Sequence, residues 1–174
     1  MKKIDQGLLP ILGESPLVLI LGSMPSIKSL ESQQYYAHPQ NAFWWIMSEL
    51  LGFDSLEPYN TRTAFIKKKK LAVWDVIQAC HRPGSLDSAI DPSSIQANDF
   101  SVLLREKTSI KLVIFNGQAA QKIFKKHVLQ NHVVERATSD FTGDFLVMPS
   151  TSPANAATNR EMKLQCWRAL IAYL

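Results

Sequence analysis

The segment Leu17-Val-Leu-Ile-Leu-Gly-Ser-Met-Pro-Ser26 decides the fold class of this chain. Its first half is wholly apolar, and its second half consists mainly of small and turn-forming residues. A short apolar run that stops at a glycine is typical of a strand buried on both faces. A buried strand followed by a polar loop predicts an α/β fold with a mostly parallel sheet.

Three further apolar runs have the same character, and stretches of helical period separate them. The predicted strands are Leu17–Leu21, Ala72–Ile77, Lys111–Phe115 and Phe145–Met148, each apolar on both faces. The predicted helices are Ala42–Leu51, Ala97–Lys107, Gln118–Leu129 and Asn159–Leu174. No internal repeat or linker divides the chain, so we expect residues 1–174 to form a single domain.

The composition is that of a globular domain, with 46% hydrophobic and 20% charged residues. No apolar run reaches the roughly 18 residues that cross a bilayer, so we expect no membrane association and no signal peptide. Two cysteines need no disulfide, which favours a cytoplasmic location. The formal net charge of +4 mildly favours a polyanionic partner.

Several kinds of chemistry lack their motifs in this sequence. The segment after the first strand has neither the glycine spacing nor the Lys-Ser or Lys-Thr pair of a phosphate loop. No nucleophile elbow is present, and the four histidines never occur at paired ligand spacing with a carboxylate. We therefore expect no catalytic triad, no metal and no cofactor.

In open α/β sheets, ligands bind beyond the carboxyl ends of the strands. The loop after the first predicted strand, Gly22–Trp44, has about twenty residues, far more than a usual βα connection. Polar, turn-rich segments also follow the other three predicted strands, at Gln78–Ile90, Asn116–Gln118 and Pro149–Ala156. These four segments are the candidate functional site. The run Lys67–Lys70 lies at the amino end of the second strand, where we expect a solvated helix end.

Two of these segments suggest ligands. The first contains Tyr35, Tyr36, His38 and Asn41, and tyrosine rings near backbone amides suit a planar heteroaromatic ligand. The alternative is that these aromatic rings only pack the loop onto the sheet. The last segment precedes the final helix, whose amino-terminal N–H groups favour a phosphate, and a helix cap at Thr158 or Asn159 is compatible with that role.

Five segments, taken in order, resemble the motifs of the uracil-DNA glycosylase superfamily, and the branch they resemble most is hypoxanthine-DNA glycosylase. The segments are Gly22–Ser26, Tyr36–Trp44, Val73–Val76 with Arg82–Ala89, Phe115–Gly117 and Pro149–Ala156. The resemblance implies a three-layer α/β/α sandwich around a four-stranded parallel sheet, with DNA bound over the carboxyl ends of the strands. It also implies a monofunctional DNA glycosylase of base excision repair that hydrolyses the N-glycosidic bond of a deaminated base, above all hypoxanthine.

Two departures from the superfamily motifs point to the catalytic residue. Mismatch-specific members place a catalytic asparagine before the proline of the first motif, where this chain has Met24. The hypoxanthine branch assigns that role to the asparagine of His-Pro-x-Asn, which is Asn41 here. Classical uracil enzymes also use a histidine in the Ser-Pro loop, where this chain has Ser150 and Thr151. The resemblance therefore implies Asn41 as the residue that positions a water, with little activity on uracil.

The resemblance also implies the binding residues. Backbone amides of Ser23 and Met24 would donate to a base carbonyl, Tyr36 would stack on the flipped base, and Asp75 and Asn116 would read its edge. The implied base-binding residues are Ser23, Met24, Tyr36, His38, Asp75 and Asn116, and the implied DNA-binding residues are Ser150, Thr151, Ser152, Pro153, Ala154 and Asn155. The motif loops contain no lysine except Lys28, so we expect no Schiff-base lyase step, and we expect a monomer.

Three alternatives stay open from the sequence. The first is a uracil or mismatch-specific glycosylase of the same superfamily. The second is a catalytically silent nucleic-acid-binding module, which the absence of asparagine at Met24 would allow and the presence of Asn41 disfavours. The third is a nucleoside hydrolase, although the chain lacks the acidic cluster that such ribose sites commonly use.

Overall fold

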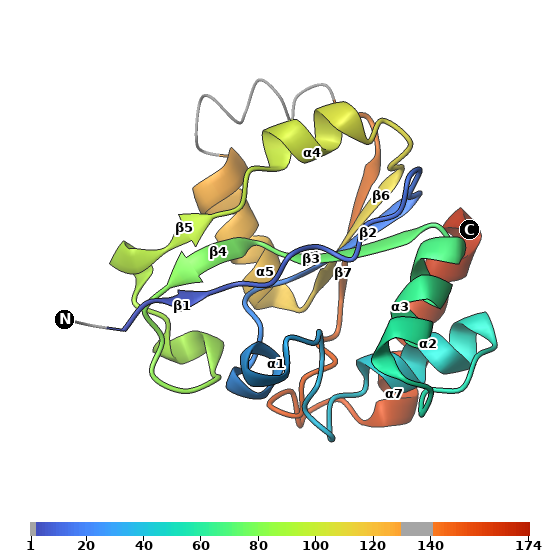
Figure 1. Ribbon diagram of the computed structural model, residues 1–174, viewed down its shortest axis with the longest axis horizontal. Helices are drawn as coiled ribbons and strands as arrows, with labels where there is room; N and C mark the ends of the chain where they lie inside the picture. The colour runs from blue at the N-terminus through green and yellow to red at the C-terminus, as the bar shows by residue number, and fades with distance from the viewer. Residues whose placement is uncertain (1–2, 130–140) are drawn as a thin grey trace.

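The computed structural model describes residues 3–129 and 141–174. Its centre is a parallel sheet in the order β3-β2-β6-β7, with the short strand β2 in its middle (Figure 1). The strands are β2 (Val18–Gly22), β3 (Leu71–Asp75), β6 (Leu112–Asn116) and β7 (Asp144–Met148). Ile20 of β2 lies opposite Val73 on one side and Ile114 on the other. The loop that follows β2 therefore leaves from the middle of the carboxyl edge.

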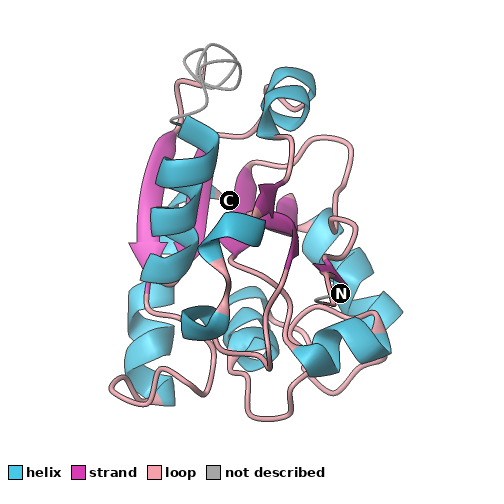
Figure 2. Cartoon of the chain, turned by 90° about the vertical axis from the view of Figure 1, so that its left-hand side faces the viewer, coloured by secondary structure: helices cyan, strands magenta, loops and turns pink. Residues whose placement is uncertain are grey.

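Helices cover both faces of this sheet (Figure 1 and Figure 2). One face packs against α2 (Phe43–Leu51), α3 (Tyr59–Lys68), α7 (Arg160–Trp167) and the 3₁₀ segment η4 (Arg168–Tyr173). The other packs against α4 (Phe100–Glu106), α5 (Gln118–Phe124) and the π-helical segment η3 (Lys125–Leu129). Along β2, Val18 and Ile20 point into the first core and Leu19 and Leu21 into the second. The predicted three-layer α/β/α sandwich is confirmed.

The apolar residues 71–80 form two strands, where we predicted one over Ala72–Ile77. The chain leaves the central sheet at Val76, and β4 (Ile77–Cys80) then joins a small antiparallel sheet of order β1-β4-β5. The other two strands are β1 (Asp5–Gln6) and β5 (Gln96–Ala97), and the 3₁₀ turns η1 (Asp87–Ala89) and η2 (Pro92–Ser94) lie between β4 and β5. Val76 and Ile77 are both apolar, so the hydrophobic pattern does not mark the point where the chain passes from one sheet to the other.

The sequence did not predict two of the helices, and it did not predict the exposed face of β7. The long first loop contains α1 (Ile27–Ser32), whose N-cap Ser26 accepts the N–H of Ser29, and α3 was not predicted at all. The expectation that every strand is covered on both faces is wrong for β7, where Phe145 is 42% and Val147 38% exposed. β7 is one of the two edge strands of the sheet; the other, β3, is buried and is bridged by Ile11 at Val73.

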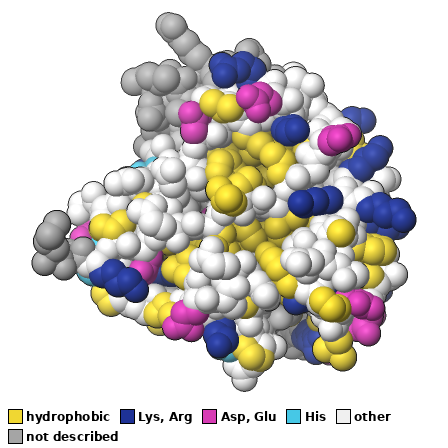
Figure 3. Space-filling view, viewed as in Figure 1, with side chains coloured by type: hydrophobic (Ala, Val, Ile, Leu, Met, Phe, Trp, Pro, Cys, Tyr) yellow, Lys and Arg dark blue, Asp and Glu magenta, His cyan; other side chains and the backbone are white. Residues whose placement is uncertain are grey.

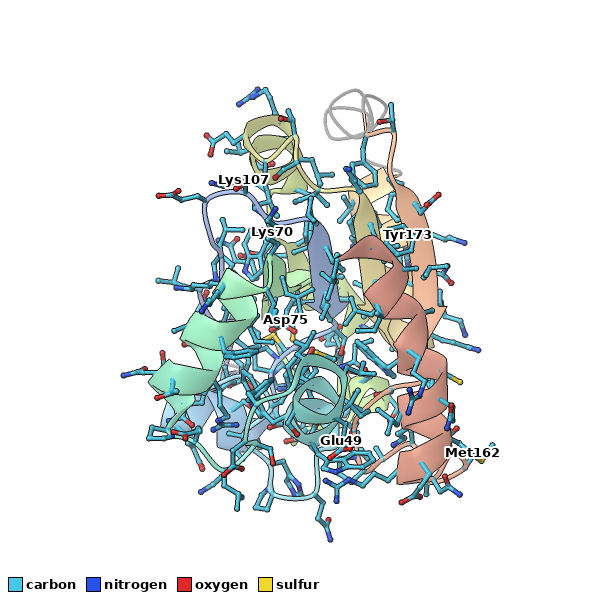
Figure 4. The ribbon with its side chains drawn as sticks, turned by 90° about the vertical axis from the view of Figure 1, so that its right-hand side faces the viewer. Glu49, Lys70, Asp75, Lys107, Met162 and Tyr173 are labelled. Carbon is cyan, nitrogen blue, oxygen red and sulfur yellow. The ribbon has the colours of Figure 1, made fainter. Side chains whose placement is uncertain are left out.

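The lysine run lies where the sequence predicted. Lys67–Lys70 are exposed at the end of α3, and Lys and Arg side chains gather on that side of the molecule (Figure 3). Lys70 and Asp75 mark opposite ends of β3 (Figure 4).

No helix in the described ranges is both long and apolar enough to cross a membrane.

The final helix tests the predicted cap. Asn159 is the N-cap of α7, and its side-chain oxygen accepts the N–H of Met162 at 2.8 Å. We expect Asn159→Ala to lower the free energy of unfolding by about 1 kcal/mol in a urea titration, because that N–H loses its acceptor. Asn60→Ala is the matched control, since Asn60 is exposed on α3 and caps no helix. Equal stability of the two variants would contradict the assignment.

Candidate active site

The segments that follow β2, β4 and β7, together with Asp75 and Asn116 at the ends of β3 and β6, line one pocket beyond the carboxyl edge. Its lining residues are Gly22, Ser23, Met24, Pro25, Ser26, Ser29, Tyr35, Tyr36, Asn41, Asp75, Ser85, Asp87, Asn116, Ser150, Thr151 and Ser152. The catalytic candidate Asn41 therefore shares a pocket with five of the six base-binding candidates. The sixth, His38, and the DNA-binding candidates Pro153, Ala154 and Asn155 lie outside its lining.

Asp75, the last residue of β3 (labelled in Figure 4), lines this pocket. Asp75 is 3% exposed, and its Oδ2 has no hydrogen-bond partner among the described residues. Burial raises the pKa of this carboxyl to about 8, against an opposing effect of the Arg82 cation and with a further increase from Asp87. Asp75 is therefore mostly protonated at neutral pH, and a protonated carboxyl can donate a hydrogen bond.

Gly22 makes this position of Asp75 possible. A Cβ on Gly22 would lie 2.3 Å from Asp75 Oδ1, well inside van der Waals contact, and 3.5 Å from Tyr36 Oη. Gly22 and Asp75 are also direct partners in the register of β2 and β3. Any side chain at residue 22 would displace the carboxyl from the pocket.

Tyr36 contributes a ring and a second buried hydroxyl. The ring stacks on Phe43, with centroids 3.9 Å apart and planes 23° from parallel. Tyr36 Oη is buried and has no hydrogen-bond partner in the described part of the chain. Burial, reinforced by Asp75 and opposed by the Asn116 side chain, raises the pKa of Tyr36, so the phenol stays neutral and keeps its proton. The pocket thus contains two buried O–H groups without partners.

Asn41 joins the pocket to the start of α2. Its Oδ1 accepts the backbone N–H of Phe43 at 3.0 Å, and its own N–H donates to the carbonyl of His38 at 2.8 Å. An amide oxygen has two lone pairs, so Oδ1 can accept a second hydrogen bond from a water. His38 shapes the turn before Asn41, because its Nδ1 accepts the N–H of Gln40 at 3.2 Å.

The backbone after β2 presents free amides to the pocket. The N–H groups of Ser23 and Met24 donate to no other residue in the described ranges. The loop after β4 holds this backbone in place, because buried Arg82 donates to the carbonyls of Met24 and Pro25, and Ser23 Oγ donates to Asp87 at 2.6 Å. Arg82 begins the motif segment Arg82–Ala89, but its role in holding this backbone was not predicted.

Asn116 and Thr151 bind each other reciprocally. Asn116 Nδ2 donates to Thr151 Oγ1 at 2.9 Å, and the Thr151 N–H donates to Asn116 Oδ1 at 2.8 Å. The Thr151 carbonyl in turn accepts the Ala42 N–H at 3.0 Å. These bonds hold the loops after β6, β7 and β2 together, so Asn116 supports the pocket wall in addition to lining it.

The outer part of the last loop is held by hydrogen bonds within the loop. Asn155 Nδ2 donates to the Ser150 carbonyl at 3.2 Å, and the Ala154 N–H donates to Ser152 Oγ at 3.2 Å. Pro153 and Ala154 are exposed at its tip. The loop therefore has its inner residues in the pocket and its tip at the surface.

Comparison with known proteins agrees with this arrangement. A family model described as the uracil DNA glycosylase superfamily matches residues 10–171. This chain belongs to that superfamily. Its motif segments, apart from the tip of the last loop, are the ones that build the pocket.

Two curated members of the superfamily are similar over much of their length, and both are named hypoxanthine DNA glycosylase. The protein from Methanosarcina barkeri is 40% identical over 68% of this chain and 73% of its own. The protein from Methanosarcina acetivorans is 33% identical over 98% of this chain and 99% of its own. The solution NMR structure of a candidate uracil DNA glycosylase from Methanosarcina acetivorans has a TM-score of 0.76 at 30% identity and covers 97% of this chain and 99% of its own.

In the described part of this superfamily member, no three His, Cys, Asp or Glu side chains gather where they could hold a metal ion. The polar groups that line the pocket are neutral donors, amide and hydroxyl groups, and the carboxyl of Asp87. The arrangement can bind a planar, uncharged ligand that carries hydrogen-bond acceptors, and it can orient a water through Asn41.

We expect Gly22→Ala to lower the free energy of unfolding by about 1–3 kcal/mol, because the added methyl group overlaps the Asp75 carboxyl. Gly13→Ala is the control, since a Cβ there meets only ordinary contacts at 3.6 Å. The double variant Gly22→Ala/Asp75→Ala lacks the carboxyl that the methyl group would overlap. Its free energy of unfolding should therefore fall by less than the sum of the decreases in the two single variants. Additive losses, or a Gly22→Ala variant as stable as Gly13→Ala, would show that Asp75 does not crowd Gly22.

Proposed function

We propose that this protein is a monofunctional DNA glycosylase of base excision repair that releases hypoxanthine from deoxyinosine in DNA. The observation that carries the proposal is a pocket that gathers several neutral hydrogen-bond donors without a partner among the described residues. Four such donors are the N–H groups of Ser23 and Met24, the protonated carboxyl of Asp75 and the hydroxyl of Tyr36. The names of the two curated relatives support the same substrate.

A cluster of donors suits the edge of a 6-keto purine. Such a base presents two acceptors, O6 and N7, whereas adenine presents an amino donor at position six. An adenine in this pocket would place its amino hydrogens against other donors and would leave them unpaired. Guanine shares the O6 and N7 acceptors, and here the duplex contributes to selection, because a mispaired inosine leaves the helix at lower cost than a paired guanine.

The proposed chemistry uses positioned dipoles. Breaking the N-glycosidic bond builds negative charge on the departing base and positive charge on the sugar. The donors at Ser23 and Met24 stabilise the charge on the base more strongly as it develops, an effect worth a few kcal/mol by analogy with oxyanion holes. Asn41 holds the attacking water through the second lone pair of Oδ1, and water adds to the sugar as the base leaves. No covalent enzyme adduct forms.

The DNA lies over the carboxyl edge of the sheet in this proposal. The flipped base stacks on Tyr36, and the segment 150–155 contacts the strand next to it through its exposed tip at Pro153 and Ala154. The proposal keeps two expectations from the sequence, namely monomeric action and a cytoplasmic location.

The proposal is tested with duplex oligonucleotides that carry a single inosine or a single uracil, and strand cleavage by alkali reports each abasic site. We expect cleavage of the inosine duplex well above that of the uracil duplex. The reverse order would favour the second candidate, a uracil glycosylase, which the description of the similar NMR structure supports. Duplex binding with no cleavage of either would identify a silent binding module, and cleavage of free inosine alone would identify a nucleoside hydrolase.

Asn41→Ala should reduce the single-turnover rate on the inosine duplex about 100-fold or more, because the water loses its acceptor. The Phe43 N–H also loses its acceptor, which will destabilise the fold by about 1 kcal/mol, so rates are measured well below the unfolding temperature of both proteins. Asn60→Ala is again the surface control. A rate for Asn41→Ala within a few-fold of wild type would remove Asn41 from the chemistry.

The pH dependence tests Asp75. Its pKa of about 8 predicts that kcat/KM for inosine falls as pH rises through 8, because the ionised carboxyl repels the O6 and N7 acceptors. Asp75→Asn keeps a neutral donor and should lack this decline.

The pH dependence of the free energy of unfolding tests the protonation of Asp75 independently. The native Asp75 carboxyl holds its proton up to about pH 8, whereas in the unfolded chain it loses the proton near the usual aspartate pKa of 3.8. The unfolded state therefore binds fewer protons between these limits, so wild type should lose stability as pH rises from about 4 to 8. Asp75→Asn should remove that contribution. Identical pH profiles of rate and stability in the two proteins would rule out a protonated Asp75.

A further inference from the structure

A second pocket adjoins the first at Asn41. It is lined by Pro39, Gln40, Asn41, Ala42, Arg160 and Lys163. It therefore lies between the loop that carries Asn41 and the first turn of α7. That turn, marked by Met162 in Figure 4, lies at the same end of the molecule as the carboxyl ends of the strands. None of the roles assigned so far uses either of its two cations.

Lys163 is a buried cation without a counter-charge. Its side chain is 5% exposed, and its Nζ donates one hydrogen bond, to the carbonyl of Ser152 at 3.0 Å. No carboxylate of the described ranges pairs with it. Burial lowers its pKa, the direction expected for an ammonium removed from water without an anion beside it. A bound anion would restore the missing charge partner and use the free N–H groups of Nζ.

Arg160 supplies a second, oriented cation to the same pocket. Its guanidinium lies over the ring of Trp45, with Cζ 3.8 Å from the ring centroid. Stacking fixes the plane of a guanidinium and leaves its N–H edge available for an anion. The neighbouring Glu161 is exposed and forms no ion pair with Arg160 or with Lys163. The positive end of the α7 helix dipole lies in the same turn.

We propose that Arg160 and Lys163 bind a phosphate of the DNA strand next to the flipped nucleotide. This inference rests on the proposed function, since it takes DNA as the substrate. The shared residue Asn41 places the anion site directly beside the base pocket, where the backbone of the same nucleotide must pass. A phosphodiester suits two converging cations and an open groove.

The site also links backbone recognition to the base pocket. Lys163 holds the carbonyl of Ser152, and Ser152 lines the base pocket. A phosphate on Lys163 would therefore fix the loop after β7 at the same time as it aligns the strand. Lys163 is a positioning residue in this account and takes no part in bond breaking.

The test is the salt dependence of duplex binding, measured from 50 to 200 mM NaCl with a duplex that carries a stable abasic-site analogue. For Lys163→Gln, whose amide can still donate to Ser152, we expect the slope of log K against log salt to fall by about 1, as for one lost phosphate contact. Arg160→Gln should have the same effect and removes an exposed side chain, so it does not depend on a buried substitution. Lys68→Gln, exposed at the end of α3, should bind like wild type.

Unchanged slopes in both Lys163→Gln and Arg160→Gln, or an equal fall in Lys68→Gln, would overturn the phosphate site. The outcome is separable from that of the proposed function. Binding with the expected slopes but without release of any base would leave the phosphate site standing and would reject the glycosylase. Release of hypoxanthine with unchanged slopes would support the glycosylase and reject the phosphate site.

Discussion

The close approach of Asp75 to Gly22 is the constraint on which the site depends. These residues are register partners on adjacent parallel strands, and only a residue without a side chain leaves room for the carboxyl between them. The carboxyl is consequently buried, and burial keeps it protonated and able to donate. An otherwise unfavourable buried acid thus becomes a neutral recognition group. The segment after β2 then places Tyr36, Asn41 and the free amides around it.

Most of the remaining polar groups serve to hold loops in position. Arg82 fixes the backbone that presents the free amides, and the pair Asn116–Thr151 joins the loops of three strands. The Asn41 side chain accepts the N–H of Phe43, the first residue of α2, while it lines the pocket. Such fixed donors need little reorganisation as charge develops on a leaving base, which is the advantage of dipoles over flexible charged side chains. The site therefore needs no strong nucleophile.

The sequence predicted the central sheet well because buried parallel strands read as continuous apolar runs. It failed where the same apolar run changes partners at Val76, and where polar segments form α1 and α3. Asn41, Asp75 and Tyr36 were found through motifs, and the structure brings them into one pocket. Arg82, Lys163 and the dual use of Asn116 could not be predicted, since they depend on contacts between segments far apart in the chain.

The most direct test of the account is to identify what the wild-type protein releases from a duplex with one inosine, by mass spectrometry of both base and DNA. The account predicts free hypoxanthine in equal amount to an intact strand with one abasic site, and no covalent protein–DNA adduct after borohydride treatment. A trapped adduct would contradict the monofunctional mechanism. Recovery of the inosine strand unchanged, from a protein shown to bind that duplex, would contradict the central claim.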